Sequence, residues 1–353
     1  MSDSLYLITA GKASPLLEKM TFAVTNSFES ITKITNSEEL PNLINKKILF
    51  SVQLNQAGFC PEMDHLLSSL WDRGEASLSG STAIVLIHCE SELFTKTYCQ
   101  NLIFHANMLG CSFMGRPYVE AAGNLYNFSV AQKTIHKPLM DVCLTLCADL
   151  GVRFKNFDPQ FIKNAKICVL HSSNFETSNT LMLWNLVYQH LQSLDIKVHH
   201  IENGTVKDCI GCPYKTCKHY GQHQTCFYGG FMVEEIYPSI LASDALILLC
   251  PNYNDGLSAN ISAVINRLTA LFRKTKFYSK SVFGIIVSGN SGSDALGKQL
   301  ISALNMNKTF RLPPYFSLCA NANDAGAILN VPGIEEKAKA FAENIKREIK
   351  KDN

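Results

Sequence analysis

The chain has 353 residues, of which 46% are hydrophobic and 18% charged, and its formal net charge is +2. A chain of this length usually divides into two domains, and this composition argues against extensive disorder. The basic residues form no stripe that would bind nucleic acid, and the apolar runs are too short to span a membrane. The first four residues show no leader pattern, so we expect a cytoplasmic protein without a nucleic-acid or membrane partner.

The first half, residues 1–157, shows an α/β pattern without clear cofactor loops. Short apolar runs predict strands, and apolar residues at helical spacing predict helices. Residues 11–14 (Gly-Lys-Ala-Ser) follow the first strand and offer few donors to a phosphate. A linker is expected at residues 156–159. The expected strands are 5–9, 48–51 and 82–87, with a short strand and turn at 110–117, and the expected helices are 94–109 and 138–150.

The second half, residues 158–353, alternates strands and helices, which is typical of a parallel sheet wound with helices. The pattern predicts a doubly wound α/β sheet of five strands. The expected strands are 167–171, 196–201, 245–249, 281–288 and 312–318. The expected helices are one whose apolar face includes residues 184–194, and those at 231–241, 259–272, 295–304 and 333–350.

Three loops follow strands of this second half, and ligands of open α/β sheets bind beyond the carboxyl ends of the strands. The first loop offers hydroxyls and amides at a helix N-terminus, which suits a phosphate monoester. The alternative is a simple helix cap by one serine, Ser178. The candidate residues of this loop are Ser172, Ser173, Asn174, Ser178, Asn179 and Thr180.

The second and third loops could contact a planar ligand. The second places a tyrosine among small and amide residues, where it could flank an aromatic ring, and the third gives glycine backbone for close approach. Ordinary surface turns are the alternative for both. The candidates are Pro251, Asn252, Tyr253 and Asn254 in the second loop, and Ser288, Gly289, Asn290 and Gly292 in the third.

Four of the 13 cysteines cluster in the segment 207–228, as Cys209, Cys212, Cys217 and Cys226. A Cys-x2-Cys pair with two more cysteines in one loop predicts a four-sulfur site, but the spacing does not separate zinc from an iron–sulfur cluster. Unmetallated thiols are a third alternative. His219 and His223 lie in the same segment and could replace a cysteine ligand. The other nine cysteines are expected to be small buried hydrophobes.

The loops together resemble the NADPH-dependent FMN reductase and iron–sulfur flavoprotein family, whose fold is flavodoxin-like. The first loop of that family reads Gly-Ser-Pro-Arg, a small residue and Asn-Thr, and here His171 and Asn174 replace the Gly and the Arg. The second loop keeps the family pattern Pro-x-Tyr-x4-Ser-Ala, followed by Asn-Arg in place of a common Asp-Arg. The matching residues are Ser172, Ser178, Asn179, Thr180, Pro251, Tyr253, Ser258, Ala259 and Arg267.

This resemblance implies a flavodoxin-like domain at residues 158–353 that binds FMN, with the cysteine loop inserted. The iron–sulfur members carry a compact cysteine motif at the same point, with tighter spacing than the four and eight intervening residues found here. It further implies that residues 1–157 form a degenerate flavodoxin-like domain. A [4Fe–4S] cluster, or alternatively zinc, would occupy the four cysteines.

The expected function is therefore that of an FMN-dependent, iron–sulfur-containing oxidoreductase or electron-transfer flavoprotein. Its electron donor would be NAD(P)H or ferredoxin, and the resemblance implies a homo-oligomer. No residue stands out as an acid–base catalyst, because the cofactors would do the redox chemistry. The alternative is a zinc-stabilised regulatory or scaffold protein that has lost flavin.

Overall fold

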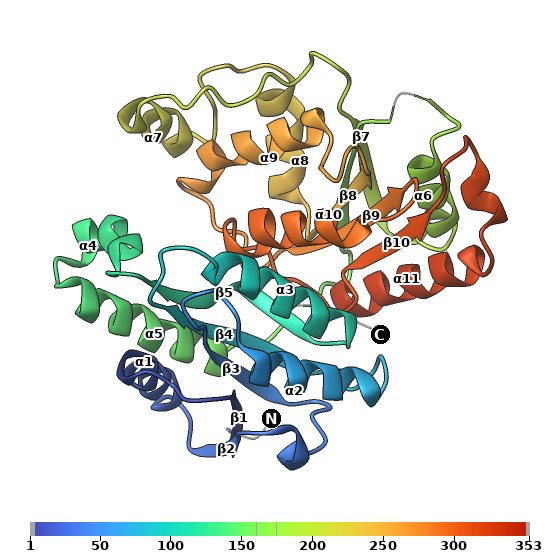
Figure 1. Ribbon diagram of the computed structural model, residues 1–353. Coiled ribbons are helices and arrows are strands. Elements are labelled where there is room, and N and C mark those ends of the chain that lie inside the picture. Colours follow the sequence, from blue (N-terminus) through green and yellow to red (C-terminus); the bar gives the residue numbers. More distant parts are fainter. Residues whose placement is uncertain (1–3, 160, 174, 351–353) are drawn as a thin grey trace. The chain divides into compact units, whose positions relative to one another are not determined.

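The computed structural model describes residues 4–159, 161–173 and 175–350. It divides into two compact units, Met1–Asp158 and Pro159–Asn353. Each unit contains one five-stranded sheet with helices on both faces (Figure 1). Within the described ranges, no helix has the length and apolar character needed to cross a membrane.

The sheet of the first unit is entirely parallel and has the strand order β2-β1-β3-β4-β5. This is the flavodoxin-like order 2-1-3-4-5, so the expected fold of the first half is confirmed. The strands are β1 (Ser4–Thr9), β2 (Ser30–Ile34), β3 (Lys47–Gln53), β4 (Thr82–Cys89) and β5 (Ser112–Ala122). The helices are α1 (Pro15–Thr25), α2 (Pro61–Asp72), α3 (Thr95–Met108), α4 (Ser129–Ile135) and α5 (Leu139–Lys155), with short 3₁₀ turns at Ser37–Glu39 and Tyr126–Phe128.

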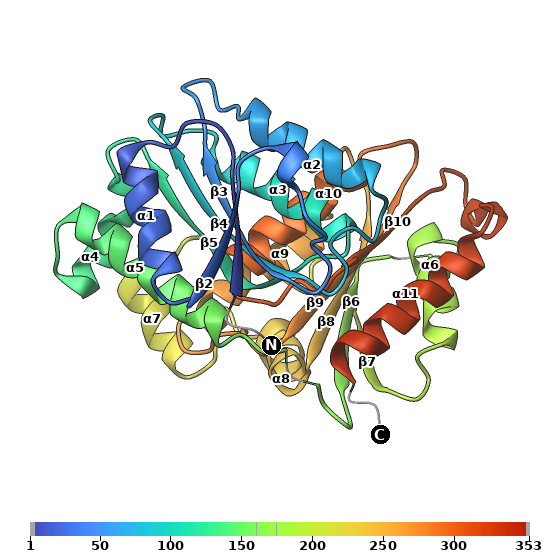
Figure 2. The same ribbon diagram turned by 90° about the horizontal axis from the view of Figure 1, so that it is seen from below.

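Helices α1 and α5 pack together on one face of this first sheet, and α2 and α3 cover the other (Figure 2). The apolar faces of α1 and α5 join buried residues of β1, β3, β4 and β5 in one hydrophobic cluster. Strand β2 lies at the edge of the sheet, and its side chains are exposed except for Ile34. The edge strand therefore adds little to the core.

The sheet of the second unit has the order β10-β9-β8-β6-β7, which is the same 2-1-3-4-5 topology. All its strand pairs are parallel. The strands are β6 (Lys166–His171), β7 (Asp195–His200), β8 (Ala245–Pro251), β9 (Ser281–Ser288) and β10 (Ser317–Asn321). The helices are α6 (Asn179–Gln189), α7 (Tyr214–Gln222), α8 (Tyr237–Ala242), α9 (Ala259–Phe272), α10 (Ser293–Leu300) and α11 (Ile334–Ile349), with π-helical turns at Met232–Ile236 and Ile301–Met306 and a 3₁₀ turn at Ala327–Asn330.

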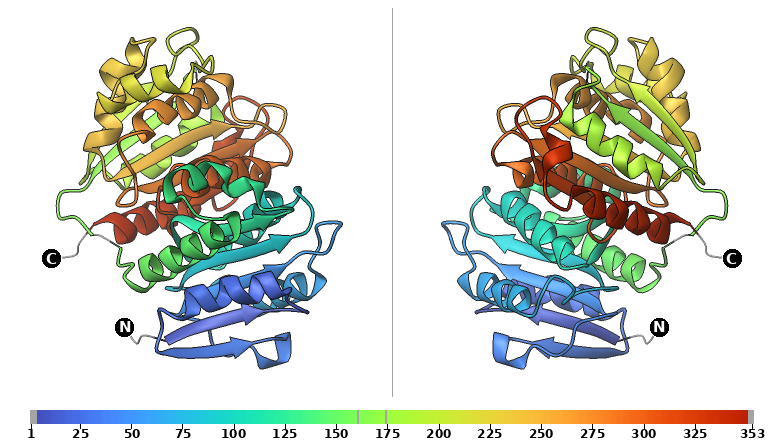
Figure 3. Two further views of the ribbon diagram at one scale, coloured as in Figure 1. Left: turned by 90° about the vertical axis from the view of Figure 1, so that its left-hand side faces the viewer. Right: turned by 90° about the vertical axis from the view of Figure 1, so that its right-hand side faces the viewer.

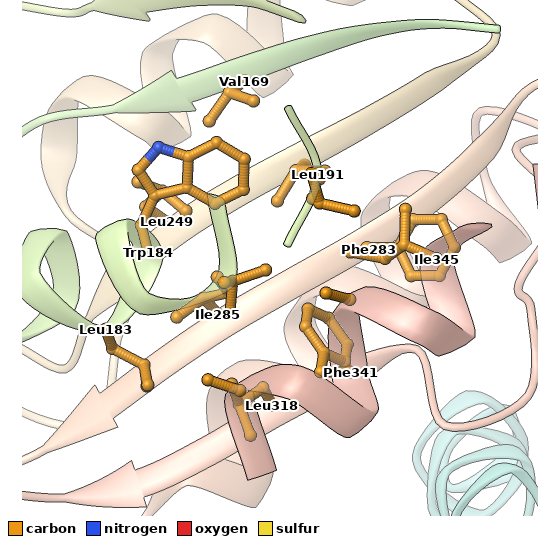
Figure 4. Packing of buried hydrophobic residues seen from close by; sticks show 14 of the residues in the cluster. Val169, Leu183, Trp184, Leu191, Leu249, Phe283, Ile285, Leu318, Phe341 and Ile345 are labelled. Atoms are coloured by element: carbon orange, nitrogen blue, oxygen red, sulfur yellow. The ribbon is translucent and has the colours of Figure 1, made fainter. Parts of the chain in front are cut away.

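One core of the second unit lies between its sheet and the pair α6 and α11, which run side by side on one face (Figure 3). Trp184 of α6 and Phe341 of α11 pack against Leu249 and Ile285 of the central strands (Figure 4). Every residue of β8 and β9 is buried. This explains why these strands read as continuous apolar runs, as expected for parallel strands covered on both faces.

The expected strand at residues 312–318 is wrong in its position, because β10 begins only at Ser317. Pro313 and Pro314 lack the amide donors that a ladder needs, and Tyr315 has a positive φ of 49°. Before the two prolines, Arg311 forms an isolated parallel β-bridge with Ser281. Its buried guanidinium pairs with the carboxylate and carbonyl of Glu348 on α11, so this segment anchors the last helix.

Candidate functional site

Four loops meet at the carboxyl edge of the second sheet and are connected by side-chain hydrogen bonds. The amide of Asn179 donates to the carbonyl oxygens of Ala322 and Asp324 beyond β10, at 3.1 and 2.8 Å. The carbonyl of Asn179 accepts from the amide of Ile328 at 3.1 Å. Asn179, a predicted cofactor residue, thus holds the last loop against the first.

The first loop leaves the N-terminus of α6 without a side-chain cap. Ser178 occupies the N-cap position but makes no capping hydrogen bond; its hydroxyl instead donates to the Ser173 hydroxyl at 3.0 Å. The hydroxyl of Ser172 pairs with that of Ser258 at 2.7 Å, and Thr180 is buried. Asn174 lies outside the described residues. Among the described residues no side chain caps this helix start, so its first backbone amides are in place to donate to an anion.

The equivalent helix of the first unit begins differently. Ser14 caps α1, its hydroxyl accepting from the amide of Leu17 at 3.2 Å. The same hydroxyl lies 2.8 Å from Nδ1 of His88, and the Ser14 amide donates to Gln53 at 3.1 Å. The hydroxyl and the amide of Ser14 at this helix start are thus bonded within the protein. The two units therefore share a topology but differ at the place where a phosphate would bind.

The second loop presents an exposed aromatic ring on a rigid turn. Tyr253 and Gly256 exchange backbone hydrogen bonds of 3.3 and 3.2 Å, and the two residues between them, Asn254 and Asp255, have φ values of 53° and 56°. The side chain of Gln299 on α10 fixes this turn through the carbonyl of Asp255 at 3.0 Å. Tyr253 is 58% exposed, so its ring is available to stack on a planar ligand.

Asn252 joins the second loop to the third. Its amide nitrogen lies within 3.2 Å of Asp255, 3.1 Å of the Ser288 hydroxyl and 3.0 Å of the Ser291 carbonyl. Gly292 has a φ of 88°, and a Cβ there would meet the Asp255 carboxylate at 2.2 Å, so the close approach of the two loops requires glycine. Asn252 and Ser288 thus shape the site, while Gly289 and Asn290 are exposed at its surface. Pro251 ends the buried strand β8.

A stacked histidine pair lies beside the first loop, where the sequence pattern gave no signal of it. His171 and His200 are register partners at the ends of β6 and β7, and their rings are parallel with centroids 4.6 Å apart. Burial, together with the neighbouring His200, lowers the pKa of His171 to about 4. His171 is therefore neutral at physiological pH. Side chains alternate between the two faces of a sheet, and register partners point to the same face. The two rings therefore lie on one face because His171 and His200 are register partners, which the sequence alone does not show.

The four clustered cysteines line one cavity. Cys209, Cys212, Cys217 and Cys226 all line a cavity of about 120 Å³ together with residues of α9. Cys209 is exposed and the other three are half-buried, whereas eight of the nine remaining cysteines are buried and Cys319 is half-buried. His219 and His223 are exposed and do not line the cavity.

Helix α7, absent from the expected elements, carries Cys217 and packs on α9. Gly221 makes this approach possible, because a Cβ there would meet the carbonyl oxygen of Ala270 at 2.4 Å.

Among the described residues, no three His, Cys, Asp or Glu side chains converge tightly enough to hold one metal ion. The cavity is roughly ten times the 10–15 Å³ that a water molecule needs.

The second unit is thus a flavodoxin-like α/β domain with polar loops at the carboxyl edge of its sheet, the candidate ligand edge, and a separate thiol-lined cavity. Residues 165–324 match the profile of the NADPH-dependent FMN reductase family. The FMN reductase part of the resemblance inferred from the loops is thereby confirmed for this unit, and the match supports an oxidoreductase with FMN as its cofactor. No curated protein matches the sequence.

Solved structures with similar folds include three reductases. A putative quinone reductase from Klebsiella pneumoniae is 14% identical with a TM-score of 0.39, over 53% of this chain and 87% of that one. The NAD(P)H:quinone oxidoreductase from Methanothermobacter marburgensis is 10% identical with a TM-score of 0.39, over 52% and 98%. An FMN-dependent NADH-azoreductase from Bacillus anthracis, solved with FMN, is 8% identical with a TM-score of 0.34, over 52% and 98%.

Proposed function

We propose that this protein is an FMN-dependent, iron–sulfur-containing oxidoreductase in which the second unit binds both cofactors. The observation that carries the flavin part is the open start of α6. Ser178 stands at the N-cap without capping, and the helix dipole and the first backbone amides favour a phosphate there. The family match over residues 165–324 supports FMN as the phosphate ester concerned.

The residues of the ligand edge divide into two roles. Ser173, Ser178 and the first amides of α6 would hold the phosphate, and the exposed ring of Tyr253 would lie against the flavin. Asn179 and Asn252 would keep the loops in place, since their side chains already bond to protein. Bound FMN would supply hydride and single-electron chemistry, and a cluster would pass single electrons. NAD(P)H or ferredoxin would be the donor, and the protein would act as a homo-oligomer.

The four cysteines would hold a [4Fe–4S] cluster. In such a cluster each thiolate binds a different iron, so the sulfur atoms stand further apart than around one tetrahedral zinc ion. The four thiols that line one cavity support a four-thiolate site. Metal ligation would also order the segment that carries Cys209 and Cys212.

Elemental analysis and visible spectra of protein purified without air test this function. The proposal expects about four iron atoms and one flavin per chain. Cys212→Ser should lose the cluster absorbance and keep the flavin, because the flavin loops lie on other strands. Cys319→Ser is the matched control: it removes a half-buried thiol of the same unit outside the cavity and should keep the iron. Stoichiometric zinc without iron or flavin would support the scaffold alternative and refute the proposal.

A further inference from the structure

An arginine of α9, Arg267, lies in the wall of the thiol cavity and is almost completely buried. It is 3% exposed and lines the cavity beside all four clustered cysteines. Nη2 donates to the carbonyl oxygen of Gly229 at 3.0 Å, which fixes the chain just after Cys226. Within the described part of the chain, its Nε is buried and has no hydrogen-bond partner. A buried donor without an acceptor is costly, so a further acceptor is expected at this position.

The setting of Arg267 is electropositive as well as buried. Residues 207–228 and 266–276 contain one acidic residue, Asp208, whose carboxylate already accepts from Asn266 at 2.9 Å and from the Cys209 amide at 2.6 Å. The basic residues of these segments are Lys207, Lys215, Lys218, Arg267, Arg273, Lys274 and Lys276. Of the two arginines that line the cavity, Arg273 is exposed and stacks on Tyr214 at 4.9 Å. Only Arg267 brings its charge into the desolvated wall.

We infer that Arg267 is a positioning and counter-charge residue for the cluster held by the four cysteines. The inference rests on the proposed function, since it assigns the missing acceptor of Nε to a cluster thiolate. Four thiolates around a [4Fe–4S] core give a net negative group that becomes more negative on one-electron reduction. A fixed buried cation stabilises the reduced form more than the oxidised form, and hydrogen bonds to the sulfurs act in the same direction. Arg267 therefore raises the reduction potential of the cluster.

The test is a spectroelectrochemical titration of the anaerobically purified full chain. Arg267→Gln removes the charge and should lower the one-electron equilibrium constant about tenfold, which corresponds to about 59 mV. Arg267→Lys keeps a charge and should stay within threefold of the wild type. Lys274→Gln is the matched control, because it removes an exposed charge beside the same helix end but outside the cavity. It should shift the constant by less than threefold.

A cluster in Arg267→Gln with an unshifted potential would overturn the counter-charge role. If Arg267→Gln is purified without iron, Arg267→Lys decides. Iron at the wild-type potential in Arg267→Lys supports the counter-charge role. Loss of iron here too refutes it, because lysine keeps the charge and only the shape of arginine is lost. Wild-type protein without iron refutes the cluster itself and this inference with it. An unshifted potential in iron-loaded variants refutes the inference alone.

Discussion

The hydroxyl pair at the start of α6 gives the sharpest test of flavin binding. Ser173 is buried, and its hydroxyl is linked to that of Ser178 at 3.0 Å, so both can turn toward a phosphate at the uncapped helix start. A hydrogen bond to a charged group is worth about 1.5–3 kcal/mol. Replacing both serines with alanine removes two such bonds and is predicted to weaken FMN binding by about 3–6 kcal/mol, or roughly 150- to 25,000-fold.

Riboflavin, which lacks the phosphate, separates this effect from general damage to the loop. Fluorescence titration of the flavin-free protein should show unchanged riboflavin affinity in the Ser173→Ala, Ser178→Ala double variant, within about threefold. The matched control is Ser14→Ala in the first unit, where the hydroxyl caps α1. That change should cost about 1 kcal/mol of stability and leave flavin affinity intact. Equal losses for FMN and riboflavin, or no loss for FMN, would refute the phosphate site.

Three further predictions concern stability, pH and stoichiometry. Arg311→Met should lower the free energy of unfolding of the second unit by about 3–5 kcal/mol, because the buried Glu348 carboxylate then keeps only its 3.6 Å ion pair with Arg347. Urea unfolding followed through Trp184 in a Trp71→Phe background measures this, and equal stability would refute it. The pKa of His171 is the ordinary 6.5 in the unfolded chain but about 4 in the folded protein. The free energy of unfolding should therefore fall as the pH drops from 6.5 to about 4, because the unfolded chain binds the proton more readily. In urea titrations, His171→Phe should flatten this slope. Extracted flavin should amount to one per chain, since α1 is capped internally by Ser14 whereas α6 is open; two would show that the first unit also binds flavin.

The fold could be predicted where apolar pattern and local chemistry agree. Helix α9 and strand β9 have the expected bounds, because α9 carries a clear apolar period and starts at a capping serine, Ser258, and β9 is a continuous apolar run. Helix α7 was missed because it buries only Gly221, and its packing on α9 leaves no apolar stripe in the sequence. Strand β2 was missed because an exposed edge strand needs no alternation of apolar residues. The Ser14–Pro15 start of α1 is a helix signal that was interpreted only as a poor phosphate loop.

The sequence indicated which loops come together at the candidate site but not what their side chains contact. The sequence indicated that Asn179 and Asn252 lie at the ligand edge, yet both side chains bond to segments distant in the chain. An amide that binds a ligand and one that ties two loops look the same in a single sequence. The thiol cluster was clear because cysteine spacing within one segment requires no long-range partner. The α9 wall of the cavity, with Arg267, depends on tertiary packing and left no comparable signal.

Helix α9 connects the two proposed cofactor sites. Its N-cap, Ser258, shares a hydrogen bond with Ser172 in the first loop, and Arg267, nine residues further on, lines the thiol cavity. At 1.5 Å per residue these points lie about 13 Å apart along the helix axis. The helix is held at both ends, by its Ser258 cap and by the close packing of Gly221 against Ala270. Because an α-helix cannot change length without losing hydrogen bonds, α9 fixes the separation of the phosphate loop from the thiols. A single rigid element therefore sets the geometry on which electron exchange between the two sites would depend.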